Sequence, residues 1–165
     1  MGLKLREMEV ADWISVAEIY KQGIETGNAT FQQTIPTWDD WNKAHISTCR
    51  LIIEVDNEAA GWTALSAVSS RPVYAGIAEV SVYVGNKYRG QQIGTKLLEA
   101  IISESESKGF WTLQAGIFPE NQASIAIHKK AGFREIGYRE KVGKMKDVWR
   151  STVLLERRST IIGID

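Results

Sequence analysis

A segment in the middle of the chain joins an apolar strand-like run to a turn rich in glycine and arginine, which then opens a helix. Val82-Tyr83-Val84 precedes the turn, and Arg89, Gly90 and Gly94 lie within it. The first N–H groups of a helix have no intrahelical acceptor, and the helix dipole adds partial positive charge there. The two glycines lack the Cβ atoms that would hold an anion away from the backbone, and Arg89 adds a cation. The segment predicts a phosphate-binding turn, although glycines also occur in ordinary strand-to-helix turns.

Composition and missing motifs argue against several other classes of function. Neither G-x-x-x-x-G-K-[ST] nor G-x-G-x-x-G occurs, so P-loop and Rossmann nucleotide sites are not supported. Twenty Lys and Arg balance twenty Asp and Glu, so no overall field recruits nucleic acid or an anionic membrane. One cysteine, Cys49, and two separated histidines suggest no metal site and fit a reducing compartment. With no long apolar run and no export signal, we expect a soluble, cytoplasmic protein.

The turn resembles the arginine-x-x-glycine-x-glycine/alanine turn of the GNAT superfamily of N-acetyltransferases, which holds the pyrophosphate of acetyl-CoA. Arg89 and Gly94 fill its first and last positions, whereas Gln92 stands where the family has its middle glycine. The segment from Asn121 to Phe133 resembles the second signature of the family, an Asn that opens a short helix ending at Gly-Phe. The resemblance covers nearly the whole chain. It implies acetyl-CoA as acetyl donor, bound by Val82, Tyr83, Val84, Arg89, Gly90, Gln91, Gln92, Ile93, Gly94, Thr95, Asn121 and Ser124.

Acetyl transfer to an amine requires a base, because an alkylamine with a pKa of about 10.4 is mostly protonated at neutral pH. Glu79 is the candidate, since it precedes the cofactor-binding residues on one strand and the family places such a residue beside the acetyl group. The alternative is a strand-end salt bridge. His128 stands where the family usually has a Tyr that protonates the departing thiolate, and the alternative is a packed or surface imidazole.

The strand itself carries a further expectation from the resemblance. Where the sheet splays, backbone groups of Val82, Tyr83 and Val84 would pair with the amides of pantetheine, and one N–H would polarise the thioester oxygen. The alternative is that all three residues pair with the next strand.

A narrower resemblance, to the phosphinothricin acetyltransferase branch, comes from Arg71-Pro72-Val73-Tyr74 followed by Glu79 and Ser81-Val82-Tyr83-Val84. Ala29-Thr30-Phe31 resembles an early acceptor-binding turn of that branch. Lys146-Asp147-Val148 resembles a late one, in which the herbicide-resistance enzymes have His instead of Lys146. A guanidinium such as that of Arg71 suits a carboxylate or phosphinate, and the alternative is an exposed loop cation. The implied acceptor residues are Thr30, Phe31, Arg71, Tyr74 and Lys146.

These observations predict an acetyl-CoA-dependent N-acetyltransferase. Its expected acceptor is the amine of a small amino-acid-like molecule of the phosphinothricin, methionine sulfone or methionine sulfoximine type, attacked directly with Glu79 as general base. The alternatives are acetylation of a protein N-terminus or a polyamine, and a CoA-binding sensor without catalysis. We expect no nucleic-acid or membrane partner. The family often forms homodimers, and the sequence fixes no interface.

The elements that position these residues follow from periodicity and end signals. Leu3 and Leu5 alternate with charged residues, which predicts a first strand with one buried face. A helix is expected from Asp12, with Ile14, Ala17, Tyr20 and Ile24 at helical intervals and Gly27-Asn28 at its end. Thr37 is the expected N-cap of a second helix.

Further along the chain, strands and helices alternate. A hairpin is expected around Asp56-Asn57-Glu58, strands at 78–84, 112–118, 133–141 and 148–155, and helices at 93–108 and from Ser124. Residues 141–146 are expected to form an exposed basic loop. The pattern predicts one mixed α/β (α+β) domain over residues 1–165, a GNAT-like fold whose central twisted mixed sheet is flanked by helices and splays after strand 78–84.

Overall fold

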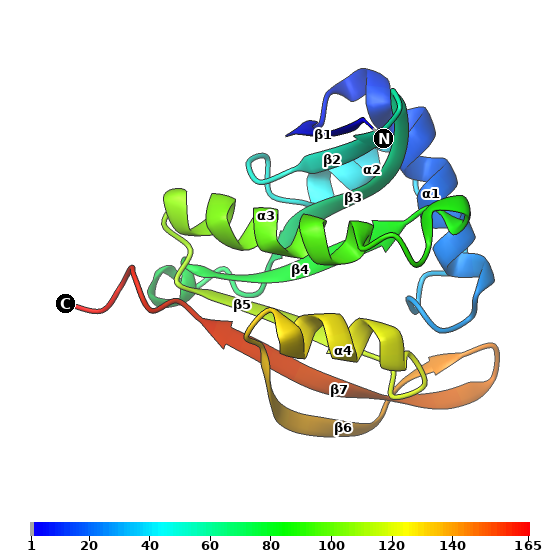
Figure 1. Ribbon diagram of the computed structural model, residues 1–165. Helices are drawn as coiled ribbons and strands as arrows, with labels where there is room; N and C mark the ends of the chain where they lie inside the picture. Colours follow the sequence, from blue (N-terminus) through cyan, green and yellow to red (C-terminus); the bar gives the residue numbers. More distant parts are fainter. Residues whose placement is uncertain (1) are drawn as a thin grey trace.

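Seven strands form one twisted sheet in the order β1-β2-β3-β4-β5-β7-β6 (Figure 1). The computed structural model describes residues 2–165, and residue 1 lies outside the described range. Among the strands of residues 2–165, β4 and β5 are the only parallel neighbours, and the other neighbouring pairs are antiparallel. The prediction of a mixed sheet in one α/β domain is confirmed. The strands are β1 (Leu3–Glu7), β2 (Leu51–Val55), β3 (Glu58–Ala67), β4 (Ile77–Val84), β5 (Thr112–Ile117), β6 (Arg134–Met145) and β7 (Val148–Arg158).

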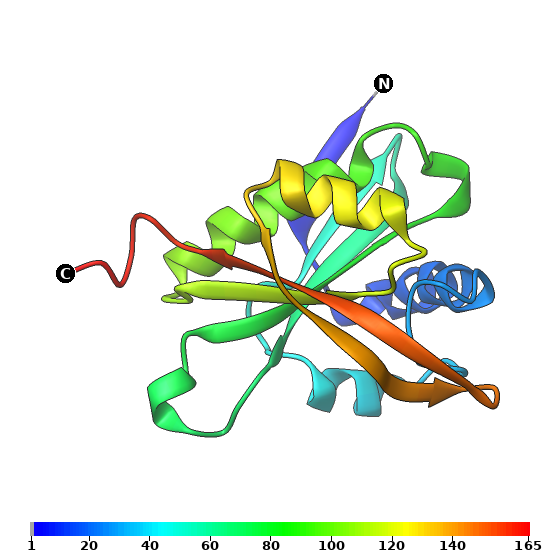
Figure 2. The ribbon, with the colours of Figure 1, turned by 90° about the horizontal axis from the view of Figure 1, so that it is seen from below.

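Helices cover both faces of the sheet (Figure 2). On one face lie α1 (Trp13–Glu25) and α2 (Trp38–Ala44), and on the other lie α3 (Ile93–Ser107) and α4 (Gln122–Lys130). Short 3-10 turns are η1 (Val10–Asp12), η2 (Pro72–Tyr74) and η3 (Asn86–Tyr88). None of the helices described is long and apolar enough to cross a membrane.

The expected helix ends are confirmed by their caps. The Thr37 hydroxyl accepts the N–H of Asp40, and the Asn121 side chain accepts the N–H of Ser124. Gly27 and Gly109 have φ of +72° and +90° after α1 and α3, where a left-handed residue ends a helix. These caps place the start of α4 and the end of α1 on either side of the site described below.

Two local expectations were wrong, and the helix expected from Asp12 forms but buries a different face from that of Ile14. Leu3 and Leu5 are 40% and 49% exposed, because β1 is an edge strand beyond the residues that pack against α3. Ile14 is 82% exposed, since α1 instead buries the face formed by Val16, Ile19 and Gly23. The basic segment 141–146 is mostly strand, because β6 continues to Met145 and only Lys146-Asp147 form the turn, at φ of +48° and +64°.

The two central strands pair over only a short length. Ile77 to Glu79 of β4 lie beside Thr112 to Gln114 of β5, and no further pairs follow. Beyond Glu79, β4 stays paired with β3 as far as Val84, while β5 stays paired with β7 as far as Ile117. The sheet therefore opens inside β4, at Glu79, rather than after the end of the strand.

Candidate active site

Two adjoining cavities lie where β4 and β5 separate. The α3 cavity, of about 580 Å³, lies between the end of β4 and the first turns of α3 and α4. The Glu79 cavity, of about 290 Å³, lies between β4, the end of β5 and the segment 29–32. Ala29, Val82, Tyr83 and Ser124 line both cavities, so a molecule can extend from one into the other.

The α3 cavity contains most of the predicted phosphate-binding turn. Arg89, Gly90, Gln92 and the segment 93–95 line it, whereas Gln91 does not. Gly90 has a φ of +78°, which favours glycine. The N–H of Lys96 donates to the carbonyl of Gln92 at 3.1 Å, so the N–H groups of residues 93–95 precede the first intrahelical bond. Three donors at a helix start therefore border this cavity, which suits an anion.

Gln92 adopts the backbone conformation that the glycine of the related motif would allow. Its φ is +64° and its ψ is +21°, in the left-handed region, and its side chain is exposed. The departure from the motif therefore changes the side chain without changing the left-handed turn.

The register of β3 and β4 shows which backbone groups face the opening. Gly85 N–H donates to Ala60 C=O at 2.8 Å, and the pairing continues with Tyr83 opposite Trp62. In an antiparallel ladder, hydrogen-bonded pairs alternate, so the N–H and C=O of Tyr83 point toward β3. Those of Val82 and Val84 point the other way, toward the opening. Of the three residues predicted, two offer backbone groups to a ligand, and Tyr83 offers its ring.

Glu79 lies half-buried at the point where the strands separate, and it lines the Glu79 cavity. Its Oε1 accepts a long hydrogen bond of 3.4 Å from Nε2 of Gln114, its neighbour on β5. None of the ion pairs within residues 2–165 includes Glu79. The salt-bridge alternative is therefore not supported by the structure, and the carboxylate is available to a ligand.

The side chain of Tyr83 was missed as a site residue. Its ring stacks on Trp62 at 4.8 Å and lies 4.9 Å from Tyr20, between centroids. A Cβ at Gly23 of α1 would lie 2.8 Å from this ring, so the helix needs glycine there to approach it. Burial raises the pKa of the Tyr83 hydroxyl, which stays protonated at neutral pH. Alternation along the strand could have identified this side chain, because it places Tyr83 on the same face as Glu79 and Ser81.

His128 is 4% exposed and lines the Glu79 cavity from α4. Its Nδ1 lies 2.7 Å from the carbonyl oxygen of Ser124, so Nδ1 carries the proton of the neutral ring. Burial lowers the pKa of His128. At neutral pH its Nε2 is therefore an acceptor, and donation of a proton to a thiolate would need the disfavoured charged form.

The predicted acceptor residues fall into two groups. Thr30 and Phe31 line the Glu79 cavity. Arg71 and Tyr74 are exposed around η2, where the Arg71 guanidinium lies 5.4 Å from the Tyr74 ring centroid, and they do not line it. Lys146 lies at the β6–β7 turn beside a separate groove. Within residues 2–165, no three His, Cys, Asp or Glu side chains are grouped as metal ligands.

The left-handed backbone at Gln92 can be tested by substitution. We expect Gln92→Val to lower the free energy of unfolding by about 1–2 kcal/mol, because a β-branched residue is strained at positive φ, and Gln92→Gly to change it by less than about 1 kcal/mol. Gln91 does not have a positive φ, so Gln91→Val is the control, with an effect within about 0.5 kcal/mol. Urea denaturation measures all three variants. Equal losses for Val at positions 91 and 92 would contradict the left-handed turn.

Comparisons with known proteins agree with this geometry. A phosphinothricin N-acetyltransferase of Alcaligenes faecalis is 28% identical over 153 residues, which cover 88% of this chain and 77% of the relative. An L-methionine sulfoximine/L-methionine sulfone acetyltransferase of Pseudomonas aeruginosa is 25% identical over 162 residues, 94% of each chain. A solved GNAT superfamily phosphinothricin acetyltransferase of Sinorhizobium meliloti, in complex with acetyl-CoA, has a TM-score of 0.85 and 26% identity over 96% of this chain and 89% of that one.

The match to a protein family is decisive, because it spans most of the chain. The model of the acetyltransferase (GNAT) family matches residues 9–133, from the residue before η1 to the residue before β6. The chain is thus an N-acetyltransferase and belongs to the GNAT family.

Proposed function

We propose that this enzyme transfers the acetyl group of acetyl-CoA to the amine of a small amino-acid-like acceptor, of the phosphinothricin, methionine sulfone or methionine sulfoximine type. The observation that carries the proposal is the opening of the sheet at Glu79. This opening creates the α3 cavity, which has the free N–H groups at the start of α3 and the outward backbone groups of β4. It also creates the adjoining Glu79 cavity, whose carboxylate forms no ion pair within residues 2–165.

The residues of the α3 cavity fit acetyl-CoA. The N–H groups of residues 93–95 and the guanidinium of Arg89 would hold the pyrophosphate, and Gly90, where a Cβ would meet nothing within 4 Å, leaves room for it. The outward N–H and C=O groups of Val82 and Val84 would bind the amides of pantetheine. When bound, acetyl-CoA supplies an acetyl thioester that an amine can attack. Solved GNAT relatives with acetyl-CoA support it as co-substrate.

Glu79 supports direct transfer by removing a proton from the acceptor. The acceptor enters as an ammonium ion, which the carboxylate attracts, and it reacts only after it has lost a proton to Glu79, directly or through a water molecule. A backbone N–H of β4 that points into the opening would donate to the thioester oxygen and stabilise the charge that develops there. Tyr83 lines the same cavity, on the face of the strand that also carries Glu79.

The lining of the Glu79 cavity restricts the acceptor. Its only carboxylate is Glu79, and Lys and Arg are absent from its lining residues among those the structure describes. The single carboxylate suits one ammonium group better than the several of a polyamine. An acceptor with an acidic group would have to reach a cation outside the cavity, and Arg71 is free for this, since it forms no ion pair within residues 2–165.

An amine screen with acetyl-CoA, read as release of the CoA thiol, tests the function. We expect release with phosphinothricin, methionine sulfone and methionine sulfoximine, and little with spermidine or with peptides that have a free N-terminus. Release only with spermidine or peptides would reject the acceptor class. Binding of acetyl-CoA by calorimetry without release for any amine would favour the non-catalytic sensor.

The base is tested by Glu79→Gln, which keeps the size of the side chain but cannot take a proton. We expect kcat to fall by roughly 10²–10⁴, with the Kd of acetyl-CoA unchanged. Glu99→Gln, at an exposed position on α3, is the matched control and should leave kcat unchanged. Near-normal turnover of the Glu79→Gln enzyme would give Glu79 a structural role.

The role of Arg71 is tested with two acceptors that differ in one charge. Arg71→Ala should raise the KM for methionine sulfone by about 10-fold or more, because a charged hydrogen bond of about 1.5–3 kcal/mol is lost, and should leave kcat almost unchanged. The KM for the uncharged amide of methionine sulfone should be the same in both proteins. An unchanged KM for methionine sulfone itself would return Arg71 to the role of a solvated loop cation.

A further inference from the structure

We propose that Arg150 is a positioning residue of the acceptor site, which holds the segment 27–31 in place as a wall of the Glu79 cavity. The proposal rests on the acetyl-transfer function proposed above. Arg150 lies on β7, outside the cavity itself, and the segment 27–31 follows α1, at the opposite end of the sequence.

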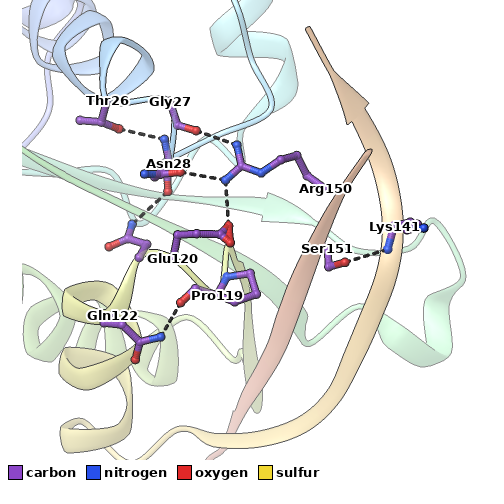
Figure 3. Close-up of polar contacts among 10 residues, drawn as sticks. Thr26, Gly27, Asn28, Pro119, Glu120, Gln122, Lys141, Arg150 and Ser151 are labelled. Atoms are coloured by element: carbon purple, nitrogen blue, oxygen red, sulfur yellow. Dashed lines mark hydrogen bonds and ion pairs between the residues drawn. The ribbon is translucent and has the colours of Figure 1, made fainter. Parts of the chain in front are cut away.

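The guanidinium of Arg150 joins three parts of the chain (Figure 3). Nη1 donates to the carbonyl oxygen of Gly27 at 2.8 Å, and Nη2 donates to Oδ1 of Asn28 at 2.8 Å and to Oε1 of Glu120 at 3.0 Å. Only 15% of the Arg150 side chain is exposed. Arg150 therefore fastens the end of the α1 segment to the β5–α4 turn, with a planar fork that a lysine cannot reproduce.

The segment has few other polar links to the rest of the molecule. The N–H of Asn28 donates to the Thr26 hydroxyl, and that of Gln32 donates to the Thr30 hydroxyl, so these bonds are local. Residues 27 and 28 are joined to distant residues by Arg150 and by Asn121, whose Nδ2 donates to Asn28 O at 3.3 Å. Further along the segment, the Thr30 hydroxyl bonds with the hydroxyls of Tyr20 and Tyr83. Without the two 2.8 Å bonds from Arg150, residues 27 and 28 would depend on the longer, 3.3 Å bond from Asn121.

Arg150 also reaches the cavity through a stack of aromatic rings. Its guanidinium carbon lies 4.0 Å from the ring centroid of Phe118, and the centroids of Phe118 and Phe31 are 4.8 Å apart. Both rings line the Glu79 cavity. The cation–π contact thus fixes one ring, which in turn supports the other.

Strand β6, which pairs with β7 beside Arg150, contacts the ring of Phe31 directly. Gly143 of β6 pairs with Arg150, and a Cβ at Gly143 would lie 2.7 Å from Cε1 of Phe31. Only a residue without a side chain lets Phe31 lie this close to the strand. Phe31 is therefore held between Gly143 and Phe118, and Arg150 secures the segment that carries it.

The test is Arg150→Met, which keeps the length of the stem over Phe118 and removes the fork. We expect the KM of methionine sulfone to rise by about 10-fold or more, because two charged hydrogen bonds to the wall are lost, with kcat and the Kd of acetyl-CoA within about 3-fold of the wild type. Arg150→Lys should give an intermediate KM. Arg134→Met is the matched control on the same hairpin, since it removes an exposed ion pair with Glu156 away from the segment, and it should not change the KM.

Hydrogen exchange of the segment provides a second readout. Amides of residues 27–32 should exchange faster in Arg150→Met, while those of α3 are unchanged. A second pair of variants tests the close approach of Gly143 to Phe31: Gly143→Ala should raise the acceptor KM, whereas Gly137→Ala on the same strand, where a Cβ would meet nothing within 4 Å, should leave it unchanged.

Each outcome decides the proposal. An unchanged acceptor KM in folded Arg150→Met overturns it. Equal weakening of acceptor and acetyl-CoA binding, together with a lower melting temperature, overturns it as well, because that pattern indicates a general loss of stability. If the wild type acetylates no amine, the proposed function fails, and the positioning of an acceptor wall fails with it. Faster exchange of residues 27–32 would then show only that Arg150 holds the segment.

Discussion

The short pairing between β4 and β5 is the constraint on which the rest of the site depends. Each strand keeps its other neighbour, so β4 is held flat against β3 while β5 follows β7 away from it. Past Glu79, the backbone groups of Val82 and Val84 lose the partners that a continuous sheet would give them. Polar backbone groups in such a position require water or a ligand. The fold thus creates a binding site from an interruption of its own hydrogen bonding.

Close packing on both faces of β4 holds the strand in place where the sheet opens. Tyr83 is held by Trp62 and Tyr20 on one face, and α1 reaches it because Gly23 has no side chain. On the other face, Val82 and Val84 pack against a buried cluster that includes Ile93 and Leu97 of α3. Interiors packed in this way leave little freedom for side chains to move. The ligand-facing groups are therefore oriented before anything binds.

Sequence patterns predicted those parts of the site that are local in the chain. The turn at Arg89 to Gly94, the Asn121 cap and the alternation around Glu79 each depend on residues a few positions apart. The exposure of Leu3 and Leu5 depends on which helix covers the edge of the sheet, which no local pattern records. The partners of Arg150 lie up to 123 positions away, so its role could not be read from its neighbours in sequence. The acceptor functions of Arg71 and Lys146 remain predictions.

The position of β7 in the sheet limits the order in which the strands can assemble during synthesis. In the sheet, β7 lies between β5 and β6, although it is synthesised after both. While a ribosome is still making β7, β5 has neighbouring strand residues only along its first half, next to β4. A nascent chain can therefore assemble β1 to β4 with their helices early, since those contacts are between successive segments. The Glu79 cavity, which residues of β5 and Thr152 of β7 line, is therefore complete only after nearly the last residues of the sheet have emerged.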